Sequence, residues 1–135
     1  MSTKIFVNLP VKDLSKSMEF FKSLGYSFNP HFTDETAACM VISDHIYSML
    51  ITEKRFKDFT PKSICDAHTS SEVLIALSCE SRGEVDETIR KVLAAGGKTI
   101  NEPQDYGFMY YRCYEDLDGH IWEVNWMDPS AVPPA

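Results

Sequence analysis

The chain has 135 residues, of which 44% are hydrophobic and 24% charged, and its 13 basic and 20 acidic side chains give a net charge of −7. A chain of this length can bury enough surface to form one globular domain. Scattered basic residues disfavour a nucleic-acid surface, because phosphate contacts need clustered Lys and Arg. No apolar run approaches the roughly 20 residues of a membrane span, and no signal-peptide pattern follows Met1. We therefore expect a cytoplasmic protein that binds neither nucleic acid nor membranes.

The cysteines are far apart in the sequence and form no C-x-x-C pair, which disfavours a zinc knuckle and a thioredoxin-like redox pair. In a reducing compartment they are expected to be free thiols. They are Cys39, Cys65, Cys79 and Cys113.

The first half of the chain predicts the element order β-α-β-β-β. Apolar residues alternate over 5–11, which indicates a strand, and Pro10 marks its end or an edge position. Asp13 is a candidate N-cap for an amphipathic helix that Gly25 ends. Three short strands separated by turn-forming residues then follow, at 26–32, 37–42 and 46–52.

The second half repeats this order after a polar linker over 53–71, in which 56–59 is expected to form a short helical turn. The helix is expected to bury Val85, Ile89, Val92 and Leu93. The expected elements are a strand at 72–79, a helix at 81–95 ended by Gly96 and Gly97, and strands at 98–100, 108–114 and 120–126. The same element order in both halves is typical of duplicated modules.

The last of these strands carries the clearest polar signal. A tight turn at Asp118 and Gly119 leads into an alternating segment in which Trp122 and Val124 share one face. We expect that face to pack in the core. Glu123 and Asn125 share the other face and would present a carboxylate and an amide to a cavity.

Two segments resemble the vicinal oxygen chelate superfamily, the group of glyoxalases, bleomycin resistance proteins and extradiol dioxygenases. They are the turn and strand of 116–124 and the segment VKDLSKSMEFFKSLGY of 11–26. The resemblance implies an α+β fold in which duplicated β-α-β-β-β modules, about 4–52 and 72–127, form a half-open cup-shaped β-barrel within one domain of residues 1–135. A ferredoxin-like sandwich is the competing fold, but it leaves two strands unassigned.

The resemblance also implies positions for a metal centre, because the family usually takes one His, Gln or Glu from each of four cup strands. Matching the first helix puts Phe6 at one position, and pairing the two His-Ile segments puts Ser48 opposite Glu123; Leu74 takes the remaining position. Only Glu123 has a competent side chain, and one carboxylate cannot hold a divalent ion tightly. We therefore expect no metal cofactor. The alternative is one divalent metal ion held through Glu123, with register-shifted partners Asn8 and Glu72.

The predicted cup lining is mostly apolar with a few polar groups, the composition of a small-molecule site. Arg112 is the expected cationic partner of Glu123, although a solvent-facing role for Arg112 is equally compatible with the pattern. The predicted ligand-binding residues are Phe6, Asn8, Ser48, Leu74, Tyr110, Arg112, Glu123 and Asn125.

The resemblance leaves the biochemical class open, including whether the protein is an enzyme. The first hypothesis is a homodimeric, metal-free protein of the bleomycin-resistance kind that binds a small-molecule ligand. The alternative is a metal-dependent lyase, isomerase or dioxygenase, similar to lactoylglutathione lyase, with unorthodox ligands. A structural or interaction module is a third reading, since fold alone does not define function.

Overall fold

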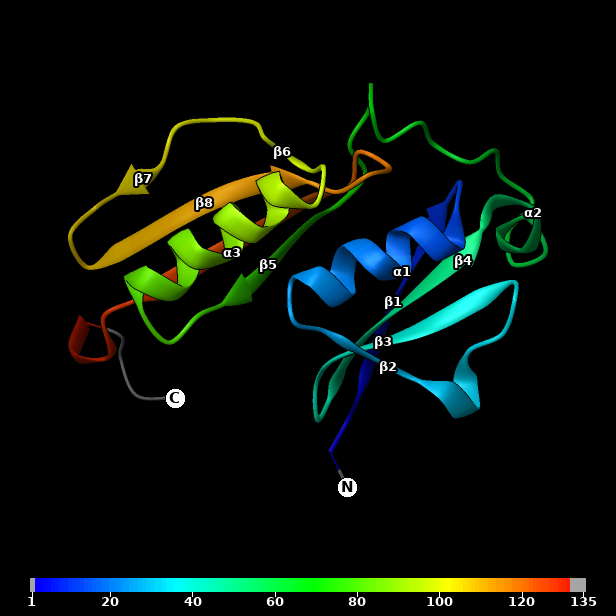
Figure 1. Cartoon of the computed structure of the whole chain (residues 1–135), viewed down its shortest axis with the longest axis horizontal. Helices are drawn as coiled ribbons and strands as arrows, with labels where there is room; N and C mark the ends of the chain where they lie inside the picture. The colour runs from blue at the N-terminus through cyan, green and yellow to red at the C-terminus, as the bar shows by residue number, and fades with distance from the viewer. Residues whose placement is uncertain (1, 132–135) are drawn as a thin grey trace. The chain divides into compact units, whose positions relative to one another are not determined.

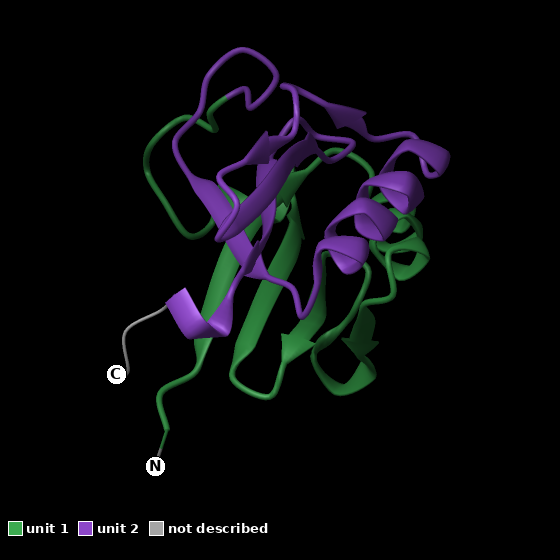
Figure 2. Ribbon diagram, turned by 90° about the vertical axis from the view of Figure 1, so that its left-hand side faces the viewer, with its two compact units in different colours: residues 1–65 green, residues 66–135 purple. Residues whose placement is uncertain are grey.

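The computed structural model describes residues 2–131, and it confirms the α+β class (Figure 1). The first half has the predicted β-α-β-β-β order, and the second half has the same order with one additional short strand. The chain divides into two units, residues 1–65 and 66–135 (Figure 2). The division falls inside the predicted linker. No helix within 2–131 has the length and apolar character needed to cross a membrane.

Unit 1 contains a four-stranded mixed sheet in the order β1-β4-β3-β2. Its elements are β1 (Ile5–Val11), α1 (Leu14–Ser23), β2 (Ser27–Asn29), the 3₁₀ turn η1 (Pro30–Phe32), β3 (Ala37–Ser43), β4 (Ile46–Thr52) and the short helix α2 (Glu53–Phe56). β1 runs parallel to β4, and the other neighbours are antiparallel. Pro10 therefore lies on an edge strand, where a missing backbone N–H costs no internal hydrogen bond.

The predicted helix of unit 1 begins and ends for the expected reasons. The Asp13 carboxylate accepts a hydrogen bond from the backbone N–H of Lys16 at 3.1 Å, which satisfies one donor of the first turn. Phe20 and Phe21 are 2% and 1% exposed. Gly25 adopts a φ of 104° just after the helix, a left-handed conformation that glycine accepts without a Cβ penalty.

Two boundaries in unit 1 differ from the prediction. The strand expected over 26–32 stops at Asn29, because the Asn29 side chain accepts from the N–H of His31 at 3.0 Å and Pro30 opens a 3₁₀ turn. The helical turn expected at 56–59 instead begins at Glu53. The Thr52 hydroxyl caps it by accepting from the N–H of Arg55.

Unit 2 contains a five-stranded sheet in the order β5-β9-β8-β6, with β7 also paired to β8. Its elements are β5 (Leu74–Ser78), α3 (Arg82–Ala94), β6 (Lys98–Thr99), β7 (Gln104–Asp105), β8 (Met109–Glu115), β9 (Ile121–Met127) and the 3₁₀ turn η2 (Pro129–Ala131). β5 is parallel to β9. β7 was not predicted, since two residues are too short to show alternation.

Helix α3 packs along β8 and β9 in unit 2 (Figure 1). Val85, Ile89 and Val92 are at most 1% exposed, as expected. Leu93 is 52% exposed, so its predicted place in the core was wrong. At about 100° per residue Leu93 lies roughly 80° from Val85 around the helix, outside a narrow buried stripe.

Candidate functional site

The turn before β9 is organised around the buried carboxylate of Asp116, which is 6% exposed. It accepts hydrogen bonds from the backbone N–H groups of Asp118 and His120 and from the Trp122 indole, each at 3.0 Å. Burial raises the pKa of Asp116 above its ordinary value. The hydrogen bonds from Trp122 and Asp118 favour the ionised form and lower the pKa, but their effect is smaller. The turn thereby fixes where β9 starts and which of its side chains face α3.

β9 presents two different faces, as the alternation predicted. Trp122 and Val124 are 0% and 2% exposed and pack on the side of α3. Glu123 and Asn125 lie on the opposite side of the sheet, and the Asn125 amide donates to Glu123 Oε2 at 3.3 Å. We call the side of the unit 2 sheet that carries Ile121, Glu123 and Asn125 the open face.

Neighbouring strands supply the surroundings of Glu123 on the open face. On β8, Cys113 is paired with Glu123 and Tyr111 with Asn125. Directly paired residues share a face. The charge on Glu123 adds to partial burial in raising the pKa of the Cys113 thiol, so this cysteine stays protonated at neutral pH. The ring of Tyr106 lies 6.3 Å from that of Tyr111.

The edge strand β5 contributes small and apolar side chains. Ala76 is paired with Glu123, and Leu74 with Ile121. Leu74 is 66% exposed. Of the predicted site residues, Leu74, Glu123 and Asn125 therefore lie together on the open face.

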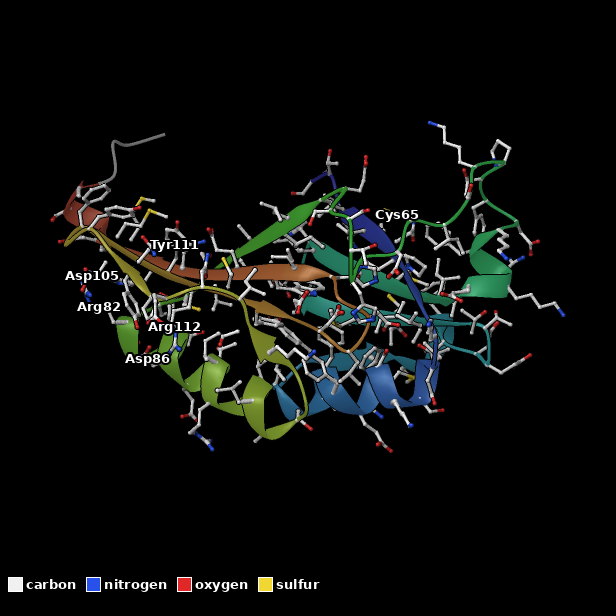
Figure 3. The ribbon with its side chains drawn as sticks, turned by 90° about the horizontal axis from the view of Figure 1, so that it is seen from above. Cys65, Arg82, Asp86, Asp105, Tyr111 and Arg112 are labelled. Atoms are coloured by element: carbon white, nitrogen blue, oxygen red, sulfur yellow. The ribbon has the colours of Figure 1, made fainter. Side chains whose placement is uncertain are left out.

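Arg112 and Tyr110 lie on the other side of the same sheet, so their predicted pairing with Glu123 was wrong. They are opposite Val124 and Trp126. Arg112 Nη1 is 3.2 Å from Asp86 Oδ1 on α3, and the Tyr110 hydroxyl donates to the same oxygen at 2.5 Å. Figure 3 shows Arg112 beside Asp86 and Tyr111 on the other side of the strand.

The length of the turn between β8 and β9 determines which β8 residue pairs with Glu123, and it would have excluded Arg112. Asp116 N–H donates to the His120 carbonyl at 3.0 Å, which makes Glu115 and Ile121 the first strand pair beyond the turn. Counting back from that pair makes Cys113 the partner of Glu123. A hairpin register is fixed by its turn, and a shift of one residue moves every side chain to the other face.

A second arginine, which the sequence reasoning missed, ties α3 to the loop between β7 and β8. Arg82 makes two hydrogen bonds to the Asp105 carboxylate, at 2.7 and 3.0 Å, and one to the Gly107 carbonyl at 2.8 Å. Its guanidinium also lies 5.3 and 5.0 Å from the ring centres of Tyr110 and Trp126. The ion pair lowers the pKa of Asp105 to about 2. These contacts hold the segment that carries Tyr106.

In unit 1, Ser48 does not share a face with Phe6 and Asn8, so that predicted grouping was wrong. Ser48 is 0% exposed, and its hydroxyl donates to the Val7 carbonyl at 2.9 Å. Phe6 and Asn8 are opposite Tyr47 and Met49 of β4. The Phe6 and Tyr47 rings are stacked with centres 4.8 Å apart.

Strand register again accounts for the error at Ser48. The pairing of β3 with β4 is irregular between Val41 and Ser43, whereas β8 and β9 pair without interruption from Glu115 and Ile121. Ile46 and Ile121 therefore begin their strands on different faces, and matching the two His-Ile segments exchanged the faces. On the face that carries Phe6, β4 offers Met49 instead of Ser48.

The side chains do not fit a divalent metal centre. No group of three or more His, Cys, Asp or Glu able to hold a metal is found among residues 2–131. Phe6, Met49 and Leu74 carry no carboxylate or imidazole, and Ser48 faces the core. Glu123 remains the one competent side chain among the family-implied positions.

Comparison with known proteins identifies solved structures that share this fold. A family model described as bleomycin resistance protein-like N-terminal matches residues 3–43. The solved structure of hypothetical protein SA1046 from S. aureus is 32% identical, with a TM-score of 0.79 over 93% of this chain and 95% of that one. No curated protein matches the chain.

More distant structures share the fold. A glyoxalase/bleomycin resistance protein/dioxygenase family enzyme from Burkholderia phytofirmans is 14% identical, with a TM-score of 0.77 over 93% of this chain and 99% of that one. The fosfomycin resistance protein FosX from Listeria monocytogenes is 19% identical, with a TM-score of 0.68 over 100% and 96% of the two chains. Residues 3–43 thus match a bleomycin resistance protein-like family model, and the chain has the fold of structures from the glyoxalase, bleomycin resistance protein and dioxygenase group.

Proposed function

We propose that this protein binds a small organic molecule on the open face around Glu123, without a divalent metal. The observation that carries this proposal is the setting of Glu123: one carboxylate, held by the Asn125 amide, among aromatic and aliphatic side chains. A few fixed polar groups on an otherwise apolar surface give a ligand orientation as well as buried area. Leu74 and Tyr106 are 66% and 57% exposed and so offer surface that a ligand can cover.

The chemistry of the donor set supports the proposed absence of a metal. A catalytic divalent ion needs about three protein ligands that offset its charge and fix its geometry. Phe6, Met49 and Leu74 provide none of these ligands. Chemistry that depends on a Lewis-acid metal is therefore not assigned to this chain.

The names of its relatives support a role in binding foreign compounds. The matching family model is named for bleomycin resistance, and FosX is named for fosfomycin resistance. A protein that sequesters a toxic compound needs affinity and exchange but no reacting group. That role suits a face whose thiol, Cys113, is kept protonated.

Two-dimensional NMR tests the binding proposal directly. Titration with a library of small aromatic and aliphatic compounds is expected to shift the signals of Tyr111, Cys113 and Glu123. Signals of Glu87 and Arg90, which pair with each other on the exposed side of α3, serve as the internal control. A library that leaves the open face unchanged, or that shifts only α3, would contradict the proposal.

Metal analysis tests the other half of the proposal. Protein incubated in turn with Mn, Fe, Ni and Zn salts and then dialysed is expected to retain less than stoichiometric metal. A stoichiometric ion that is lost in the variant Glu123→Gln would instead favour a metal-dependent lyase, isomerase or dioxygenase.

A further inference from the structure

The charges on the open face favour one class of ligand. Within the sheet of unit 2, the charged side chains that share this face are Glu115, Glu123 and Lys98, because Lys98 is directly paired with Glu115. None of the ion pairs formed by residues 66–131 includes Glu123. The Glu123 carboxylate accepts a hydrogen bond from an uncharged amide, that of Asn125.

The arginines of this unit are directed elsewhere and cannot neutralise Glu123. Arg112 is bound to Asp86, and Arg82 is bound to Asp105, both on the side of the sheet that α3 covers. Arg90 forms an ion pair with Glu87 on α3. The open face therefore keeps a net negative charge centred on Glu123.

Aromatic rings stand beside this carboxylate. Tyr111 is paired with Asn125, the residue that holds Glu123, and the Tyr106 ring lies 6.3 Å from the Tyr111 ring. The faces of aromatic rings attract cations, most strongly where water is excluded. Because Arg82 fixes Asp105 and Gly107 on either side of Tyr106, the second ring is held in place before any ligand arrives.

We propose that the open face binds an organic cation, an amine or quaternary ammonium with an apolar body, whose charge lies between Glu123 and the rings of Tyr106 and Tyr111. The inference rests on the proposed function and adds the chemical class of its ligand. The apolar body would cover Leu74 and Ala76 of β5, which lie on the same face beside Ile121 and Glu123. An anionic ligand is disfavoured, because the Glu123 carboxylate would repel it.

The test uses probes that differ mainly in charge. Benzyltrimethylammonium, benzyl alcohol and benzoate are titrated into the full chain, and binding is followed from the NMR signals of Tyr111, Cys113 and Glu123. The cation is expected to bind about tenfold more tightly than the alcohol, in line with the strength of charge-assisted contacts. Benzoate is expected to bind more weakly than the alcohol.

Variants assign the effect to Glu123. Glu123→Gln keeps the shape of the side chain and is expected to weaken cation binding about tenfold while leaving benzyl alcohol binding unchanged. Glu115→Gln is the matched control, since it removes the same charge from the same face of β8 and is expected to change cation binding less than about twofold. Tyr111→Leu removes an aromatic ring. It is expected to weaken binding of the cation several-fold more than binding of the alcohol.

The outcomes separate this inference from the function on which it rests. Equal binding of the cation and the alcohol at the open face, or an unchanged cation affinity in Glu123→Gln, overturns the choice of ligand class and leaves small-molecule binding standing. An equal effect of Glu115→Gln and Glu123→Gln overturns the assigned position of the charge. Failure of all three probes and of the compound library to shift the open face overturns both.

Discussion

Gly119 is predicted to be the glycine whose replacement destabilises this protein most. It adopts a φ of 86°, and a Cβ built at this position would lie 2.8 Å from the backbone nitrogen of His68 and 2.9 Å from the carbonyl carbon of Ala67. Both obstacles are backbone atoms, so no side-chain rotation relieves them. The segment around His68 or the turn that starts β9 must shift.

Gly25 offers a matched control that isolates the clash. Its φ of 104° imposes a similar backbone strain, but no atom lies within 4 Å of a Cβ built there. Left-handed backbone costs an L-residue about 1 to 2 kcal/mol. Forcing extra atoms into a packed site costs about 1 to 3 kcal/mol more. Gly119→Ala should therefore lower the free energy of unfolding by roughly 2 to 5 kcal/mol, and Gly25→Ala by roughly 1 to 2.

Urea denaturation followed by circular dichroism measures both variants under the same conditions. If the cost arises in the native state, the midpoint moves while the slope with urea stays the same. Equal losses for the two variants, within about 0.5 kcal/mol, would show that the contact with His68 relaxes freely. The packing of residues 66–68 on the turn would then contribute nothing to stability.

Three further predictions concern other contacts. Asp116→Ala leaves three donors without their acceptor and should cost at least about 3 kcal/mol of unfolding free energy in urea denaturation; a loss under about 1 kcal/mol would contradict the role given to this carboxylate. Because the ion pair with Arg82 lowers the pKa of Asp105 from 3.8 to about 2, its stabilising effect is complete above 3.8 and is lost as pH falls through about 2. Asp105→Asn should therefore flatten the fall of the urea midpoint in that range, and an unchanged profile would argue against the pair. Finally, because β1 and β5 each lie at an edge of their own sheet, we propose a homodimer; light scattering at micromolar concentration should give twice 15.3 kDa, and a monomer would refute it.

The sequence predicted the elements well because their signals are local. The strands at 5–11 and 46–52 have the predicted bounds, Asp13 caps the first helix as predicted, and the helix predicted over 81–95 spans Arg82–Ala94. Each signal depends on residues a few positions apart. The prediction of two β-α-β-β-β units needed only the order of these elements.

The candidate site was predicted only in part, because it depends on which strand faces which. Glu123 and Asn125 were identified from alternation within one strand. Tyr111 and Cys113 were missed because the partner of Glu123 depends on the length of the Asp116 turn. Tyr106 lies in a loop with no periodicity, and its position depends on an arginine that is distant in the sequence.

The parallel pairing of first and last strands sets the order in which each unit can form. β1 finds its partner only when β4 is present, and β5 only when β9 is present. Closing such long loops is entropically costly and slows folding. During synthesis, β5 thus stays unpaired until the chain has passed Met127, and a chain cut before β9 would leave β5, with the apolar side chain of Leu74, without a strand to pair with and open to aggregation.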